Sequence, residues 1–148
     1  MMADKAAAVL LVEDSPADRE LILRAIERAK FKEPVQVACD GAEALDYLFC
    51  RAAFSGREIQ DCPKVIFLDL KLPKVNGLEV LRQIKADPRT KAVPVVMLTS
   101  SQERNDLLAS QGLGVNSYVV KPVNFSAFDD TIGKLCHYWL SVNEPPQV

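Results

Sequence analysis

Five polar residues with the chemistry of a reactive site directly follow apolar runs of the sequence. They are Glu13, Asp14, Asp69, Thr99 and Lys121. A carboxylate at the end of a buried run must lie at the rim of a sheet, because full burial of an unpaired charge is prohibitively costly. Three carboxylates at one rim repel one another unless a cation is present, and oxygen ligands without His or Cys suit Mg²⁺. We therefore predict Mg²⁺ as the cofactor.

The two other groups suit a phosphoryl group held beside that metal. Lys121 supplies a compact positive charge, and Thr99 supplies a hydroxyl donor. Metal and lysine together neutralise phosphoryl oxygens, so that a carboxylate can attack the phosphorus atom in line. Asp69, which ends the run VIFLD, is therefore the candidate phosphoacceptor.

The elements that must position these residues alternate regularly along the chain. Apolar runs predict strands at 8–12, 35–39, 65–68, 93–98 and 117–120. Helix starts follow them at Ser15 with Pro16, Asp40 with Glu43, Asn76 with Glu79, Ser100 with Glu103, and Asn124. Continuous apolar strands separated by helices predict a parallel sheet covered on both faces. We expect an α/β, flavodoxin-like three-layer (βα)5 fold with a five-stranded parallel sheet, whose ligand crevice lies beyond the carboxyl ends of the strands.

Length and composition predict one domain. The chain has 148 residues, and we assign 1–142 to a single domain and 143–148 to an extended tail. A net charge of −2 offers no broad basic field, so nucleic acid is an unexpected direct partner. No apolar run approaches membrane-spanning length, and the first run lacks the features of a signal peptide. The four cysteines form no CxxC pair, which favours reduced thiols and a cytoplasmic location.

Four motifs in order resemble the receiver domains of two-component response regulators. They are LLVEDSPADR, FLDLKLPKVNGLEVL, VVMLTSS and SYVVKPV, and they cover nearly the whole chain. The resemblance implies that Asp69 accepts a phosphoryl group from a sensor histidine kinase. It also implies that Asp14, Asp69 and the backbone carbonyl of Lys71 bind Mg²⁺, with Glu13 acting through a metal-bound water.

The same resemblance assigns roles around the phosphoryl group. Thr99 and Lys121 would hold its oxygens, and Tyr118 would be the switch aromatic that changes rotamer as Thr99 moves. Pro122 matches a proline that is commonly joined by a cis peptide bond. Lys71 departs from the best-known receivers, where a neutral amide is common, so the phosphate lifetime does not carry over.

The connection 51–63, the segment DLKLPK and the ending HYWLSVNEPP resemble the small single-domain regulators that partner phytochrome histidine kinases. This resemblance implies a phytochrome-type kinase as partner and a homodimer formed through the carboxyl-terminal region. The last helix is expected to turn Phe125, Phe128, Ile132, Leu135 and Trp139 inward. Apolar residues continue at Tyr138, Leu140 and Val142, and we expect them to serve the homodimer. Alternatively, Trp139 folds back on the surface of its own chain.

Each site residue also has an ordinary structural interpretation. Acidic residues favour helix N-termini, which would explain Glu13 and Asp14, and Tyr118 could be simple strand packing. An aspartyl-phosphate phosphohydrolase is disfavoured, because such enzymes have a second carboxylate where this chain has Lys71. A receiver-shaped interaction module that is never phosphorylated is disfavoured, because all the reactive positions are filled. We therefore expect a phosphoacceptor signalling protein that is not an enzyme and that, with no second domain after the last helix, acts through protein contacts.

Overall fold

A computed structural model of the chain describes residues 6–144. In this part of the chain, five parallel strands form one sheet in the order β2-β1-β3-β4-β5. The strands are β1 (Val9–Val12), β2 (Val35–Ala38), β3 (Val65–Leu68), β4 (Val95–Thr99) and β5 (Ser117–Val120). The predicted flavodoxin-like fold is confirmed. No helix within residues 6–144 combines the length and the apolar character needed to cross a membrane.

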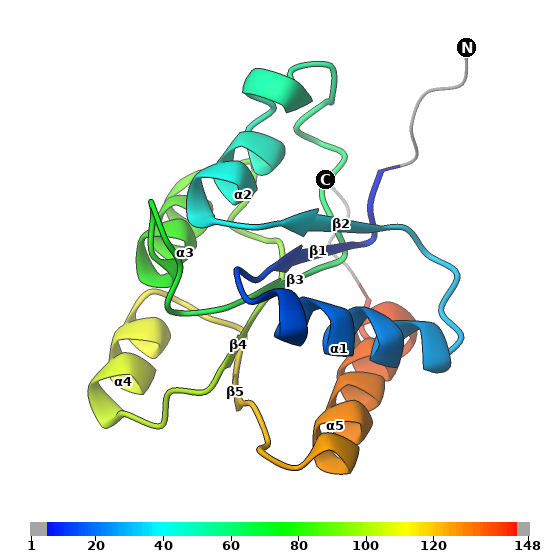
Figure 1. Cartoon of the computed structure of the whole chain (residues 1–148). Coiled ribbons are helices and arrows are strands. Elements are labelled where there is room, and N and C mark those ends of the chain that lie inside the picture. Colours follow the sequence, from blue (N-terminus) through cyan, green and yellow to red (C-terminus); the bar gives the residue numbers. More distant parts are fainter. Residues whose placement is uncertain (1–5, 145–148) are drawn as a thin grey trace.

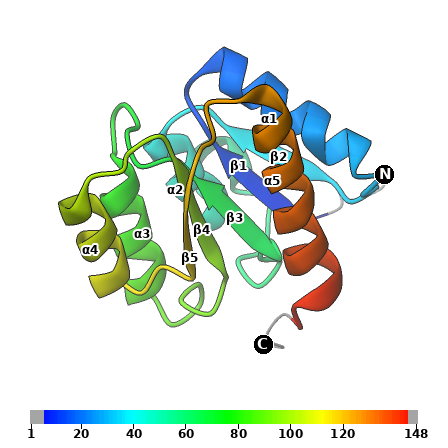
Figure 2. The ribbon, with the colours of Figure 1, turned by 90° about the horizontal axis from the view of Figure 1, so that it is seen from below.

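Helices cover both faces of the sheet. They are α1 (Pro16–Arg28), α2 (Gly41–Leu48), α3 (Gly77–Ala86), α4 (Arg104–Gly112) and α5 (Phe125–His137), with a short 3-10 helix η1 (Ala52–Phe54) after α2. Figures 1 and 2 show α1 and α5 side by side on one face and α2, α3 and α4 on the other. Each face has its own apolar core, in which residues of alternate orientation on β1, β3 and β4 meet the helices of that side.

The strand register brings the ends of β1 and β3 together. Val12 lies opposite Leu68 at the end of this pairing, and Glu13 and Asp69 are the next residues of the two chains. The Asp69 amide donates to the Val12 carbonyl at 3.1 Å, and the Glu13 amide donates to the Ala38 carbonyl at 3.0 Å. Because these strands are parallel and in register, Glu13 and Asp69 leave the sheet at the same edge.

Four of the five predicted helix caps are confirmed. In each, a side-chain oxygen accepts from a backbone amide in the first turn, as Ser15, Asp40, Asn76 and Asn124 do. The predicted cap of the fourth helix by Ser100 with Glu103 is wrong. Glu103 holds the N-cap position without a side-chain cap bond to any described residue, and it is Ser101 that bonds to this helix. The path of the loop after β4 decides this, and helix periodicity carries no information about that path.

The helical segment at the carboxyl-terminal end continues beyond α5. After α5 the chain continues as a π-helix, η2 (Tyr138–Val142), which buries Leu140 and leaves Tyr138 and Val142 exposed. Trp139 is half-buried against its own core and meets the Tyr138 ring edge-on, with 4.9 Å between ring centroids. Residues 145–148, which hold most of the predicted tail, lie outside the described residues.

One predicted inward residue of α5 is wrong. Phe125 is 56% exposed, and the Arg28 guanidinium lies over its ring at 5.7 Å from the centroid. Phe125 is the first residue of α5, one turn before the contact of this helix with the sheet begins at Phe128. A helical apolar stripe therefore predicts burial only where the sheet extends far enough to cover it.

Candidate functional site

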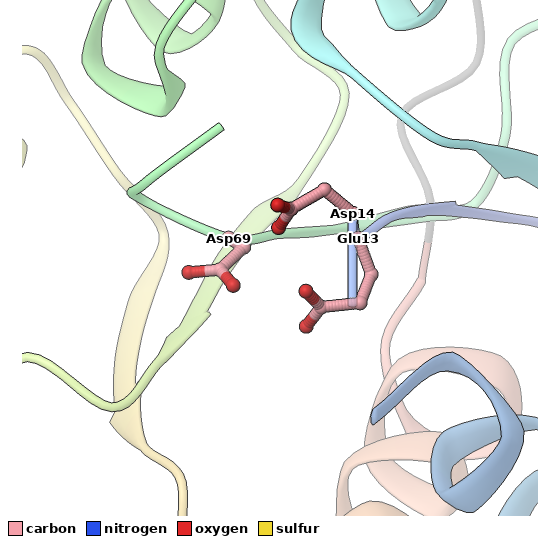
Figure 3. A group of neighbouring side chains, drawn as sticks. All are labelled: Glu13, Asp14 and Asp69. Atoms are coloured by element: carbon pink, nitrogen blue, oxygen red, sulfur yellow. The ribbon is translucent and has the colours of Figure 1, made fainter. Parts of the chain in front are cut away.

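Three carboxylates meet just beyond the ends of β1 and β3. One oxygen from each of Glu13, Asp14 and Asp69 lies within 4.8 Å of the others, and Figure 3 shows the three carboxyl groups side by side. Glu13 is 1% exposed, Asp69 is half-buried and Asp14 is exposed to solvent. The donor set consists only of oxygens and is open on the Asp14 side, which fits a hard cation that keeps several waters.

The Lys121 ammonium lies against this cluster. Its Nζ donates to Asp69 Oδ2 at 3.2 Å, to Asp18 Oδ2 at 2.9 Å and to Glu13 Oε1. Only 7% of its side chain is exposed. The Lys121 amide donates to the Thr99 carbonyl at 2.7 Å, which continues the pairing of β4 and β5 and aims the side chain across the ends of the strands.

Asp18 was missed by the sequence analysis. It belongs to the first turn of α1, where its amide is bonded to the Ser15 cap and its carboxylate reaches Lys121. The sequence feature that could have identified Asp18 is its position in SPADR. This segment starts the helix that follows the first strand, so its first turn lies near Glu13 and Asp14. By itself that feature indicates only an acid at a helix N-terminus.

Burial and charge oppose each other at Glu13. Burial raises the pKa of this carboxyl to about 7; the hydrogen bond from Lys121 acts in the other direction and the Asp69 charge adds to the increase. Burial alone would lower the pKa of Lys121, but its bonds to Glu13 and Asp18 raise that pKa above its usual range. Lys121 is therefore a permanent cation of the site, whereas burial disfavours the charged form of Glu13.

Thr99 and Tyr118 both contact Ser101, a residue that the sequence analysis did not select. The buried Thr99 hydroxyl accepts from the Ser101 amide at 3.2 Å. The Tyr118 hydroxyl donates to the Ser101 carbonyl at 3.1 Å. The two predicted switch residues are thus linked through the backbone of the loop that follows β4.

Two close approaches hold the loop 70–76 beside the three carboxylates. A Cβ on Gly77 would lie 2.2 Å from the Asp69 carbonyl oxygen, and a Cβ on Gly41 would lie 1.8 Å from the Val75 carbonyl oxygen. The starts of α3 and α2 therefore pack directly against backbone. Lys71 is exposed in this loop. The role of its carbonyl as a metal ligand stays a prediction.

The expectation of a cis bond before Pro122 is wrong for this structure. No peptide bond among residues 6–144 is cis, so Lys121 and Pro122 are joined in trans. An X-Pro bond favours trans by only ~0.5–1 kcal/mol, so local surroundings decide the isomer. With this trans bond, Lys121 Nζ contacts all three of its carboxylate partners.

Two curated relatives match most of the chain. The chain is 44% identical over 138 residues to the probable methanogenesis regulatory protein FilR2 of Methanothrix harundinacea, covering 93% of this chain and 86% of that protein. It is 36% identical over 132 residues to the response regulator Rcp1 of Synechocystis, covering 89% and 88%. The Mn²⁺-bound crystal structure of Rcp1 superposes with a TM-score of 0.87 at 34% identity, over 94% of this chain and 98% of that one.

Two further solved structures share this fold and carry phytochrome in their names. The bacteriophytochrome response regulator RtBRR is 54% identical, with a TM-score of 0.74 over 93% of this chain and 82% of that one. The phosphorylated cyanobacterial phytochrome response regulator RcpA is 37% identical, with a TM-score of 0.88 over 94% and 97%. Residues 9–132 match the response regulator receiver domain. The chain therefore belongs to the receiver domain family of response regulators.

Proposed function

We propose that the chain accepts a phosphoryl group on Asp69 from a sensor histidine kinase and passes the signal on through protein contacts. The observation that carries the proposal is the position of Asp69. It lies among carboxylates that can hold a cation, with the Lys121 ammonium 3.2 Å from its Oδ2. An Asp69 oxygen would attack phosphorus in line, forming a P–O bond as the bond from phosphorus to the donor histidine nitrogen breaks.

The residues of the cluster fit Mg²⁺. Asp14, Asp69 and the Lys71 carbonyl would bind it directly, and Glu13 would act through a bound water. When bound, the ion would neutralise phosphoryl oxygens and reduce their repulsion of the attacking carboxylate. An ion beside Glu13 also favours the ionised form of this buried carboxyl. Lys71 stands where a neutral amide is common in receivers. We therefore expect it to influence the lifetime of the phosphorylated state, and Lys71→Asn would change that lifetime.

A phytochrome-type histidine kinase is the proposed partner. The names of RcpA and RtBRR support it, as does the motif resemblance of the connection 51–63. We place the protein in the cytoplasm, which the four free thiols at Cys39, Cys50, Cys62 and Cys136 support. Its only reactions would be its own phosphorylation and dephosphorylation.

The test is Asp69→Asn, because the amide keeps the shape of the side chain and removes its nucleophilic charge. We expect labelling by acetyl phosphate, or by a purified phytochrome-type kinase, to be lost in this variant and in wild type without Mg²⁺. Asp61→Asn, at an exposed aspartate of the connection 51–63, is the matched control and should label normally. Stoichiometric labelling of Asp69→Asn at another residue would contradict the assignment, and an unlabelled wild type would favour an inert interaction module.

A homodimer through the carboxyl-terminal end is the second part of the proposal. Tyr138 and Val142 are about half exposed on η2, whereas Leu140 belongs to the core. We expect the double variant Tyr138→Ser with Val142→Ser to shift the mass measured by light scattering from dimer to monomer. The control variant Leu108→Ser, on α4, should remain a dimer. A wild-type monomer at high micromolar concentration would exclude this interface.

A further inference from the structure

Ser101 uses every polar group it has, and it is buried between the end of β4 and the start of α4. Its amide donates to Thr99 Oγ1 at 3.2 Å, and its carbonyl accepts from the Tyr118 hydroxyl at 3.1 Å. Its own hydroxyl donates to Asp106 Oδ2 at 2.5 Å and accepts from the Glu103 amide at 3.3 Å. One residue thus connects the end of β4 and the Tyr118 side chain on β5 to the first turn of α4.

The hydrogen bond to Asp106 matters because α4 has little apolar packing. Ser110 is the one residue that this helix, all of it described, buries fully, and Leu108 is 49% exposed. The Ser110 hydroxyl donates to the Asp106 carbonyl at 2.8 Å, one turn farther along. The amino-terminal end of α4 is therefore held largely by polar bonds that meet at Ser101 and Asp106.

Movement of Thr99 would disturb this arrangement. If the Thr99 hydroxyl turns toward a phosphoryl group on Asp69, the Ser101 amide loses its acceptor in a buried place. An unsatisfied buried donor is costly, so Ser101 must shift to a new partner. Any such shift must stretch or break the short hydrogen bond from Ser101 to the Asp106 carboxylate, which is charge-assisted and therefore among the stronger bonds of the loop.

We propose that the Ser101–Asp106 hydrogen bond is a latch that holds Thr99 in its unphosphorylated position and must open when Asp69 is phosphorylated. The inference rests on the proposed phosphorylation of Asp69. Ser101 and Asp106 are in this view positioning residues, since they act on the phosphoryl group only through Thr99. Because the latch opposes the phosphorylated arrangement, its removal favours that arrangement.

The test measures the affinity for beryllofluoride, which mimics a phosphoryl group on a carboxylate, at saturating Mg²⁺ by amide NMR. Ser101→Ala deletes the hydroxyl and leaves the backbone bonds to Thr99 and Tyr118 possible. We expect it to bind beryllofluoride about 10- to 100-fold more tightly, the range that one hydrogen bond to a charged group gives. Asp106→Asn should tighten binding less, because the amide still accepts a weaker hydrogen bond. Ser100→Ala, at the exposed neighbouring serine, should match wild type.

Two further variants separate a latch from a simple helix cap. Ser101→Thr keeps a hydroxyl and should restore the wild-type affinity, and Ser101→Ala combined with Asp106→Asn should bind no more tightly than Ser101→Ala alone. Mg²⁺ affinity should stay unchanged throughout. Unchanged or weaker beryllofluoride binding in Ser101→Ala, or additive effects in the double variant, would overturn the latch. A wild type that does not bind beryllofluoride at all would instead overturn the proposed phosphorylation of Asp69.

Discussion

Helices α3 and α4 are neighbours of similar length, 10 and 9 residues, that are held in opposite ways. Helix α3 is capped by the Asn76 side chain and buries Val80, Leu81 and Ile84. Helix α4 has no side-chain cap from Glu103 within the described chain and buries only Ser110. Apolar burial resists displacement in any direction, whereas a few directional hydrogen bonds can be exchanged for others. We therefore infer that α3, which supports the Asp69 loop, keeps its position, and that α4, which follows Thr99, can shift when Asp69 is phosphorylated.

The largest expected effect comes from shortening one apolar side chain in each helix. Ile84 is fully buried, so Ile84→Ala should lower the free energy of unfolding by ~2–5 kcal/mol through lost burial and a cavity. Leu108→Ala in α4 should change it by no more than about 0.5 kcal/mol. Urea unfolding followed by circular dichroism measures both. Equal losses in the two variants would remove the contrast between the helices.

Glycine substitutions give a smaller and more local effect. Gly77→Ala places a methyl group against the Asp69 carbonyl and should cost about 1–3 kcal/mol of stability, because the atoms that the added Cβ meets are backbone and cannot turn aside as a flexible side chain would. It should also weaken Mg²⁺ binding, since Asp69 must move. Gly112→Ala is the matched control at the end of α4, where an added Cβ would meet no described atom within 4 Å. We expect no loss of stability in Gly112→Ala. A melting temperature for Gly112→Ala below that of Gly77→Ala would contradict this interpretation.

The smallest expected effect concerns pH at the far end of α3. The Asp87 side chain accepts hydrogen bonds from the Arg89 side chain and amide, which lower its pKa from 3.8 to about 2. Its folded pKa is below its unfolded value, so its contribution to stability is present above about pH 4 and is lost as pH falls toward 2. An NMR titration of the carboxyl carbon should give a midpoint near 2 in wild type and a higher midpoint in Arg89→Ala, still below the ordinary value because the backbone amide at position 89 keeps its bond to Asp87. Arg89 is exposed and Asp87 is partly exposed, so the effect on stability should be slight.

The strand-end residues of the site could be predicted because a parallel sheet in register carries them to one edge. Asp69, Thr99 and Lys121 each end an apolar run, and the pairing of the strands brings them together without further information. Asp18 and Ser101 lie outside the strands, in a helix turn and a loop. Their contacts depend on loop paths that no periodic pattern encodes, which explains why the sequence analysis passed over both.

The same limit explains the wrong expectations about helices. Local rules placed four caps correctly, because a cap needs only the four residues around it. The Ser100 cap failed because the loop before α4 presents the next serine instead. Phe125 failed for a different reason, since the helical stripe was right in period but extended past the edge of the sheet.

The contacts at Gly41 and Gly77 fix the main chain of the loop 70–76 but do not depend on its side chains. The loop is anchored through carbonyl oxygens of Asp69 and Val75, atoms that every amino acid carries. The Lys71 side chain is meanwhile exposed to solvent. Evolution can thus exchange the side chain at position 71 while the main chain keeps its course, and so can an engineer. Under the proposed function, one substitution at position 71 would change how long the phosphorylated state lasts and leave in place the residues proposed to bind the metal.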